Sequence, residues 1–190
     1  MIELHPAAQR VASLVTSVGD DQLDLPTPCP DQCVGDLIDH IGVFAVRFAA
    51  TARKDSGGTA PPPAPDAANL EEGWRGRIER DLHALAEAWD DPQAWEGYTL
   101  AGGIEMPAEV AGLVALDELV VHGWDIAVAT GRRSVPPVHE IDAATGFVSS
   151  FDAPRDGALF GPVVAVADDA PPLDRLLGAT GRDPSWHPPA

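Results

Sequence analysis

The segment at residues 107–131 constrains the fold of this chain more than any other, because it has the length of a long helix and almost no charge. Past its first turn, its only ionisable side chains are Asp117, Glu118, His122 and Asp125. A helix that is apolar around most of its circumference is buried on more than one side. We therefore expect this segment, which ends on a glycine suited to a helix C-terminus, to form the centre of a helical fold.

Three of these side chains share one face of the expected helix. Glu118 and His122 are four residues apart and Asp125 follows three residues later, so all three fall within a narrow arc. The rest of that arc is small or apolar, and two carboxylates and an imidazole are costly to bury there without compensation. A metal ion would compensate them, provided that a further ligand comes from another part of the chain.

Amphipathic periodicity elsewhere predicts an all-α fold. Six helices are expected, four long and two short, at residues 5–18, 32–53, 70–89, 107–131, 138–150 and 173–179. Asp31 is placed to cap the second helix, and the apolar face of the fifth is expected to begin at Val138. A short hairpin is expected between Trp95 and Ile104. Together these elements predict a four-helix bundle with an extra C-terminal helix and an extended tail, as a single domain over residues 1–190.

Composition argues against several classes of partner. The chain carries 30 acidic and 12 basic residues, a formal charge of −18, which disfavours nucleic acid and anionic membrane surfaces. No apolar run is long enough to cross a membrane, and the N-terminus lacks the basic and apolar regions of a signal peptide. We therefore expect a cytoplasmic protein with no membrane partner.

The two cysteines, Cys29 and Cys33, stand in a C-x-x-x-C spacing between prolines and polar residues. This spacing differs from the C-x-x-C of redox and zinc-ribbon sites, and no second pair completes a four-thiolate site. Reduced structural thiols are the expected state, with a regulatory or metal-adjacent thiol as the alternative.

A third metal ligand is available on the second expected helix. His40 lies at the flank of the apolar stripe of that helix, so His40, Glu118 and His122 can meet if the two helices face each other. Three protein ligands leave a coordination position open, which a catalytic zinc site needs, and nickel or iron suit the same donor set. The plainer alternatives are a hydrogen-bonded core histidine and an exposed Glu–His ion pair.

Two stretches of the chain, together with the tail at residues 160–184, resemble a known family. The first stretch runs Thr27-Pro-Cys-Pro-Asp31 and Val34-Gly-Asp-Leu-Ile-Asp-His40, and the second runs Glu118-x-x-x-His122-Gly-Trp-Asp125. They are similar to actinobacterial DinB-like metalloproteins, and more closely to the N-terminal domain of mycothiol-dependent maleylpyruvate isomerase and its metal-binding relatives. The separate C-terminal substrate domain of the isomerase is not expected in this chain.

The resemblance implies a ligand set and a cosubstrate. The metal would be held by His40, Glu118 and His122, with Asp125 as a supporting residue that orients an imidazole or anchors the helix end. A surface or capping role is the alternative for Asp125. The resemblance also implies mycothiol as a low-molecular-weight thiol that is used together with the metal.

The sequence is compatible with several functions. The leading hypothesis is a metal-dependent enzyme that lowers the pKa of a thiol, which then attacks a small-molecule electrophile in a transfer or isomerisation. One alternative is metal-assisted hydrolysis, with Glu105 or Asp125 as the base. Another is a non-catalytic metal-binding or sensing module whose fourth ligand comes from His83, His139 or Cys33. A helical scaffold that forms a homodimer is the last.

Overall fold

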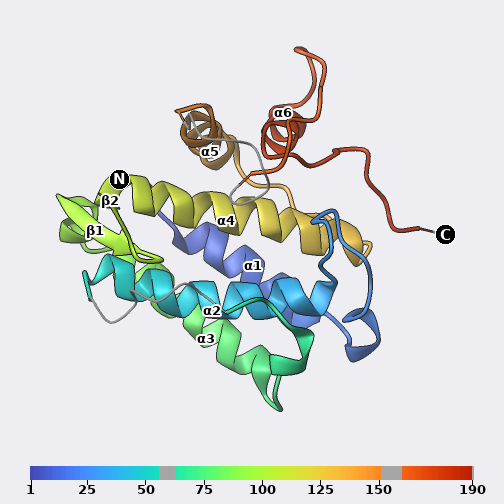
Figure 1. Ribbon diagram of the computed structural model, residues 1–190, viewed down its shortest axis with the longest axis horizontal. Helices are drawn as coiled ribbons and strands as arrows, with labels where there is room; N and C mark the ends of the chain where they lie inside the picture. The colour runs from blue at the N-terminus through green and yellow to red at the C-terminus, as the bar shows by residue number, and fades with distance from the viewer. Residues whose placement is uncertain (56–62, 151–159, 190) are drawn as a thin grey trace.

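The computed structural model describes residues 1–55, 63–150 and 160–189. A bundle of four long helices dominates it (Figure 1), formed by α1 (His5–Ser17), α2 (Val34–Ala52), α3 (Trp74–Trp89) and α4 (Ala108–Ala129). Helices α3 and α4 each pack against both α1 and α2, so the two pairs alternate around the bundle. Two further helices follow, α5 (Val138–Ser150) and α6 (Pro172–Ala179). The predicted all-α bundle is confirmed.

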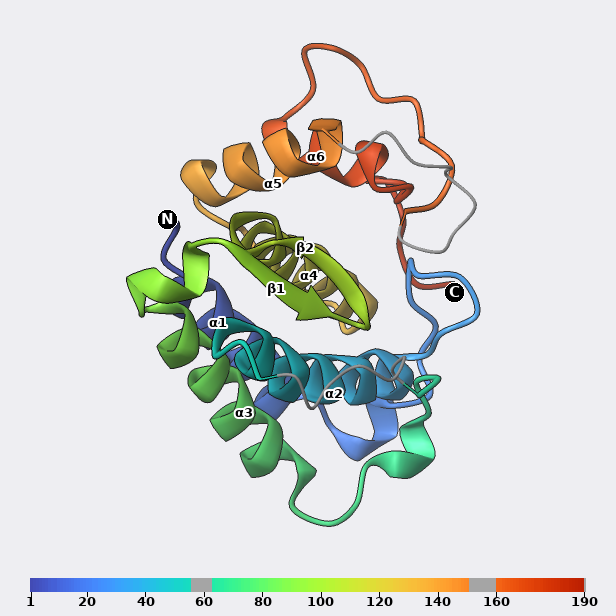
Figure 2. The same cartoon turned by 60° about the vertical axis from the view of Figure 1, so that its left-hand side comes forward.

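Helix α4 lies at the centre of the molecule. It packs against α1 and α2 on one side and α5 on another, and Figure 2 shows it between these layers. Leu119, Val120 and Val121 follow one another in α4, so their side chains point in different directions around it, and all three are buried. Burial on several sides explains why this helix carries so little charge. None of the described helices, α4 included, is long and apolar enough to span a membrane.

The start of α2 differs from the expectation. Asp31 adopts a left-handed backbone with φ of 62°, and the residue that caps α2 is Cys33, whose N–H donates to Asp36 at 2.9 Å. The Thr27 hydroxyl lies 2.8 Å from the carbonyl oxygen of Gln32 and holds the preceding loop in a turn. The predicted cap at Asp31 is therefore wrong, because this turn delays the helix by two residues.

A small hairpin precedes α4, as expected. Strands β1 (Tyr98–Ala101) and β2 (Ile104–Pro107) pair antiparallel around Gly102 and Gly103, whose φ angles are 58° and 84°. Positive φ at both positions is the requirement of the tight two-residue turn that glycine pairs favour. The Thr99 hydroxyl donates to the Thr51 carbonyl at 2.7 Å and fixes the hairpin to the end of α2.

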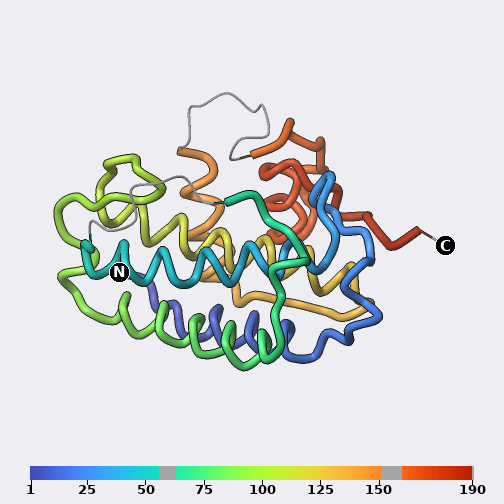
Figure 3. The backbone as a smooth tube through the Cα atoms, turned by 60° about the horizontal axis from the view of Figure 1, so that its bottom comes forward, coloured from blue at the N-terminus to red at the C-terminus, as the bar shows by residue number. Residues whose placement is uncertain are grey.

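The C-terminal segment returns to the bundle and meets the loop before α2. The extended stretch that begins at Phe160 runs along α6, where the Val164 N–H donates to the Gly178 carbonyl at 3.0 Å. After α6 the chain lies beside the loop at residues 27–33, although the two are far apart in the sequence (Figure 3). The side chains of Arg182 and Cys29 are in contact there. These two segments form the rim of the site described below.

Two helical glycines should respond to alanine in opposite ways. A methyl group at Gly112 of α4 would overlap the ring of Trp95, whereas one at Gly146 of α5 would meet no atom of another described element within 4 Å. We expect Gly112→Ala to destabilise the fold by about 1–3 kcal/mol through overpacking. Gly146→Ala should stabilise it by about 0.5–1 kcal/mol, because alanine loses less backbone entropy on folding. Urea unfolding measures both, and shifts of the same sign would contradict this packing.

Candidate metal centre

Three potential ligands converge between α2 and α4. His40 projects from α2, and Glu118 and His122 lie one turn apart on α4. The Nε2 atoms of His40 and His122 lie 2.9 Å and 3.2 Å from the same oxygen, Oε2 of Glu118. All three potential ligand atoms lie within 4.8 Å of one another. The fold therefore brings together the three residues that the sequence singled out.

The spacing of these atoms fits a divalent ion. Ligand atoms around a tetrahedral zinc, each about 2.0–2.2 Å from the ion, are about 3.3 Å apart. Two pairs of ligand atoms in this cluster are separated by 2.9 Å and 3.2 Å, and all three atoms lie within 4.8 Å of one another. Two imidazoles and a carboxylate suit zinc, and nickel or iron accept the same donors. In the described part of the chain no other group of three ligand-type side chains converges in this way.

Asp125 contacts His122 from the side away from the other ligands. It is fully buried, and its Oδ2 lies 3.0 Å from Nδ1 of His122. An Nδ1–H that donates to this carboxylate leaves the lone pair of Nε2 directed at Glu118. That arrangement is the usual one for a metal-binding imidazole, whose second nitrogen donates to a carboxylate or carbonyl.

Electrostatics in the cluster favour a positive charge between the carboxylates. Burial alone would raise the pKa of Glu118, but the charge of His122 and hydrogen bonds from both imidazoles hold it well below its usual value. Burial would likewise lower the pKa of His122, yet the Glu118 charge and the Asp125 hydrogen bond raise it to about 9. A divalent cation would supply the positive charge that this environment stabilises.

The ligand atoms face a pocket of about 450 Å³. His40, Glu118 and His122 line it together with the loop at residues 29–32 and the C-terminal segment, including residues 180–182. In Figures 1 and 2 that loop and the segment after α6 lie side by side at one end of the bundle. The pocket leaves room beside the ligands for a small molecule.

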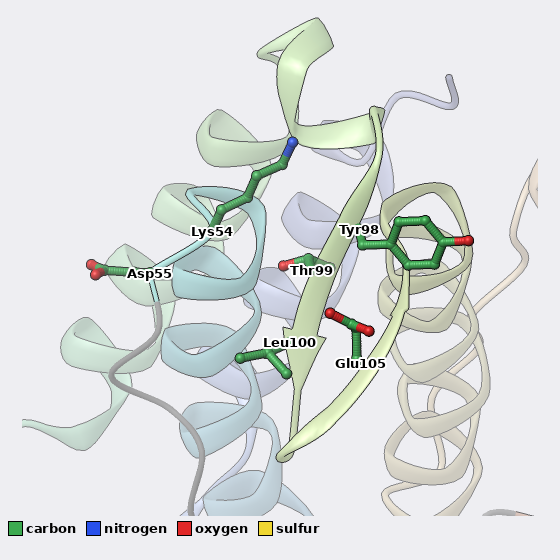
Figure 4. Close-up of a pocket in the computed structure, with 6 residues that line it drawn as sticks. All are labelled: Lys54, Asp55, Tyr98, Thr99, Leu100 and Glu105. Atoms are coloured by element: carbon green, nitrogen blue, oxygen red, sulfur yellow. The ribbon is translucent and has the colours of Figure 1, made fainter.

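A second, smaller pocket of about 200 Å³ lies beside the hairpin (Figure 4). Lys54, Asp55, Tyr98 and Glu105 are among the residues that line it. The Lys54 ammonium group donates to a backbone carbonyl at 2.8 Å, and Asp55 points away from Glu105 in the close-up. Glu105 lines this pocket and not the one that holds His40, Glu118 and His122, so it is in no position to act as a base at the metal cluster.

The expected fourth ligands also lie away from the cluster. His83 is on α3, His139 is exposed on α5 and Cys33 caps α2, and none of the three lines the pocket of the candidate metal centre. The thiol that does line it is Cys29.

Cys29 should be a poorly reactive thiol. Burial is the main cause that raises its pKa to about 11, although Arg182 partly offsets it. Because the thiolate is the reactive form, about one thiol in a thousand is ionised at pH 8 with such a pKa. We expect iodoacetamide to modify Cys29 slowly at pH 8 and faster as the pH approaches 11, followed by mass spectrometry. Modification at pH 8 as fast as that of an unstructured cysteine peptide would contradict this.

Arg182 was not predicted from the sequence as a residue of the site. Its guanidinium donates to Oδ2 of Asp125 at 3.1 Å and lines the metal pocket, although its backbone is 57 residues further along the chain. Periodicity in a short C-terminal helix gives no information about such a long-range contact. The one local signal is the repeated Ala-Thr-Gly-Arg at residues 129–132 and 179–182.

A family model decides the relationship of this chain to known proteins. The model of the mycothiol maleylpyruvate isomerase N-terminal domain matches residues 4–127. The chain belongs to this family. The match confirms the resemblance inferred from the sequence, and it includes His40, Glu118, His122 and Asp125.

Relatives of this maleylpyruvate isomerase-like chain extend the similarity beyond the matched domain. Two uncharacterized proteins of Mycobacterium tuberculosis, from strains CDC 1551 / Oshkosh and ATCC 25618 / H37Rv, are each 30% identical to it over 190 residues. The similarity covers 94% of this chain and 95% of each relative. It therefore continues beyond residue 127, where the matched domain ends.

Solved structures show the same fold. The crystal structure of the mycothiol-dependent maleylpyruvate isomerase superposes with a TM-score of 0.57 at 15% identity, over 76% of this chain and 64% of that one. A histidine-to-alanine variant of the isomerase gives a TM-score of 0.55 at 17% identity, with the same coverage. The predicted DinB-like helical fold is confirmed. The present chain spans 64% of the length of the isomerase.

Proposed function

We propose that this chain binds one divalent metal ion, preferably zinc, through His40, Glu118 and His122, and uses it in a thiol-dependent transfer or isomerisation. The observation that carries the proposal is the convergence of three ligand atoms within 4.8 Å at the wall of an open pocket. Three protein ligands with an open position are typical of catalytic rather than structural zinc. Membership of the maleylpyruvate isomerase family and the name of the solved relative support mycothiol as the thiol.

In this proposal the ion, when bound, lowers the pKa of a low-molecular-weight thiol that enters the pocket. The chain supplies the remaining functions. His40 and His122 set the position of Glu118 from two helices, and Asp125 orients His122. The loop at residues 29–32 and the C-terminal segment shield the site and leave space for an electrophile. Cys29 itself is unsuited to be the nucleophile, because burial raises its pKa to about 11.

The test combines a metal assay with a thiol-dependence assay. The purified full chain is loaded with zinc, freed of unbound metal, and incubated with mycothiol and monochlorobimane as a reactive electrophile. We expect conjugation above the uncatalysed rate only when zinc and mycothiol are both present, and loss of that rate after chelation. Conjugation that is unchanged by chelation, or a protein that retains no zinc, would overturn the proposal.

Two alternatives give different results in the same series. A metal-dependent hydrolase would cleave a p-nitrophenyl ester with zinc and without any thiol. A non-catalytic metal-binding module would hold zinc with four protein ligands and show neither activity. The room beside the cluster favours an open position, since His83, His139 and Cys33 lie outside the pocket.

A further inference from the structure

Arg182 reaches the metal pocket through a helix cap that the chain uses twice. The sequence Ala-Thr-Gly-Arg ends α4 at residues 129–132 and α6 at residues 179–182. In both caps the glycine has a positive φ, 69° and 90°, and the arginine N–H donates to a carbonyl of the last helical turn, at 2.7 Å and 2.9 Å. In both, Nη1 of the arginine also donates to the threonine carbonyl at 3.1 Å. The two arginines therefore leave their helices in the same way.

The two caps direct their guanidinium groups to different places. Arg132 donates to the carbonyl of Ser17 at 2.6 Å and to Gln22 at 3.1 Å, outside the metal pocket. Arg182 donates to Oδ2 of Asp125 at 3.1 Å, and its side chain is only 11% exposed. The chain thus contains a matched pair, in which one arginine serves the fold alone and the other also contacts the candidate metal centre.

A single carboxylate oxygen links Arg182 to a proposed ligand. Oδ2 of Asp125 is 3.1 Å from Arg182 and 3.0 Å from Nδ1 of His122. The other carboxylate oxygen of Asp125 is buried with no hydrogen-bond partner among the described residues. These two donors on one oxygen are therefore the side-chain contacts that hold the Asp125 carboxylate in place. Whatever fixes this carboxylate also fixes the ring of His122.

We propose that Arg182 is a positioning residue of the metal centre, which holds Asp125 against His122 and so directs Nε2 of His122 at Glu118. The inference rests on the proposed metal site and adds a residue from outside the matched family domain. It makes the C-terminal cap of α6 part of the metal centre, so metal affinity should depend on a segment that contributes no ligand.

A purely electrostatic role and a positioning role of Arg182 predict opposite changes in zinc affinity when its charge is removed. A cation beside the site repels a divalent ion, so Arg182→Met would strengthen zinc binding if charge alone mattered. Loss of a group that supports a ligating histidine weakens metal affinity by roughly 10–100-fold. Because Arg182 acts one contact further out than Asp125, we expect the zinc Kd of Arg182→Met to rise roughly ten-fold, at the low end of that range.

The experiment measures the zinc Kd of full-length variants by competition with a chelator, with circular dichroism to confirm folding. Arg182→Met should bind zinc more weakly, whereas the matched control Arg132→Met should keep the wild-type Kd. In an Asp125→Ala background, Arg182→Met should no longer weaken binding, because the residue through which it acts is gone. An unchanged or lower Kd for Arg182→Met overturns the inference. A wild-type protein that binds no zinc overturns the proposed function instead.

A second variant keeps the charge and moves the arginine. Gly181 has a φ of 90°, and a methyl group there would lie 2.8 Å from Cα of Gly161, so Gly181→Ala must shift the cap. Gly131→Ala places a side chain at the same kind of positive φ in the α4 cap, but its methyl group would meet none of the described residues within 4 Å. We expect Gly181→Ala to weaken zinc binding and Gly131→Ala to leave it unchanged. Equal zinc affinities in the two folded variants would contradict a positioning role for Arg182.

Discussion

Replacing His122 with alanine should abolish stoichiometric zinc binding. Both ring nitrogens of His122 are engaged in the cluster, because they face Glu118 and Asp125 at 3.2 Å and 3.0 Å. Loss of a ligand should cost more than the roughly 100-fold upper end for a supporting residue. Metal content after dialysis, together with the zinc Kd from chelator competition, measures the effect.

Zinc-dependent stability gives a second measurement of the same change. A ligand at about 100 times its Kd stabilises the folded state by about 2.7 kcal/mol, so zinc should raise the unfolding free energy of the wild type by that amount. His122→Ala should show no such increase. The control is His139→Ala, which removes an exposed histidine on α5 outside the pocket and should retain full zinc binding. Equal zinc binding by His122→Ala and the wild type would remove His122 from the site.

Replacing Glu140 with alanine should produce a large loss of stability. Glu140 is completely buried on α5, and both of its carboxylate oxygens are paired with the guanidinium of Arg10 on α1. Removing one partner of a buried ion pair costs about 3–5 kcal/mol because the other charge is left without compensation, and we expect the low end of this range because the Arg10 side chain is 21% exposed. Urea unfolding of Glu140→Ala measures this, with exposed Asp142→Ala on the same helix as the control.

A double variant separates the loss of the pair from the loss of a single charge. Arg10→Met combined with Glu140→Leu removes both charges and fills the space with apolar atoms, which is often neutral or stabilising. We expect this protein to unfold at a urea concentration close to that of the wild type. A double variant as unstable as Glu140→Ala would mean that the ion pair itself, and not the uncompensated charge, dominates the effect.

The sequence predicted the bundle because helices and their apolar faces depend on local periodicity, whereas the set of His40, Glu118 and His122 as ligands was implied by the family resemblance. Glu118 and His122 share a face through their four-residue spacing, and the helix that carries His40 could only pack its apolar stripe against a neighbour. The near absence of charge in α4 correctly placed that helix at the centre. Membership of the family was likewise visible in the residues around His40 and His122.

Other features depended on contacts that local patterns do not encode. The apolar face of α5 was expected to begin at Val138, but Val138 is 62% exposed and Glu140 is buried in its place. The cause is Arg10 on α1, which makes a buried carboxylate acceptable at that position. Arg182 was missed for the same reason, since its partner Asp125 lies far away in the sequence.

The proposed site holds one metal ion through His40, Glu118 and His122, with a coordination position left open to the pocket. A crystal structure of the zinc-loaded protein would test this through the identities and number of the ligands. We expect two imidazole nitrogens and one carboxylate oxygen from these residues, with Asp125 on Nδ1 of His122 and a non-protein ligand in the remaining position. Zinc held by four protein side chains, or bound away from these three residues, would contradict it.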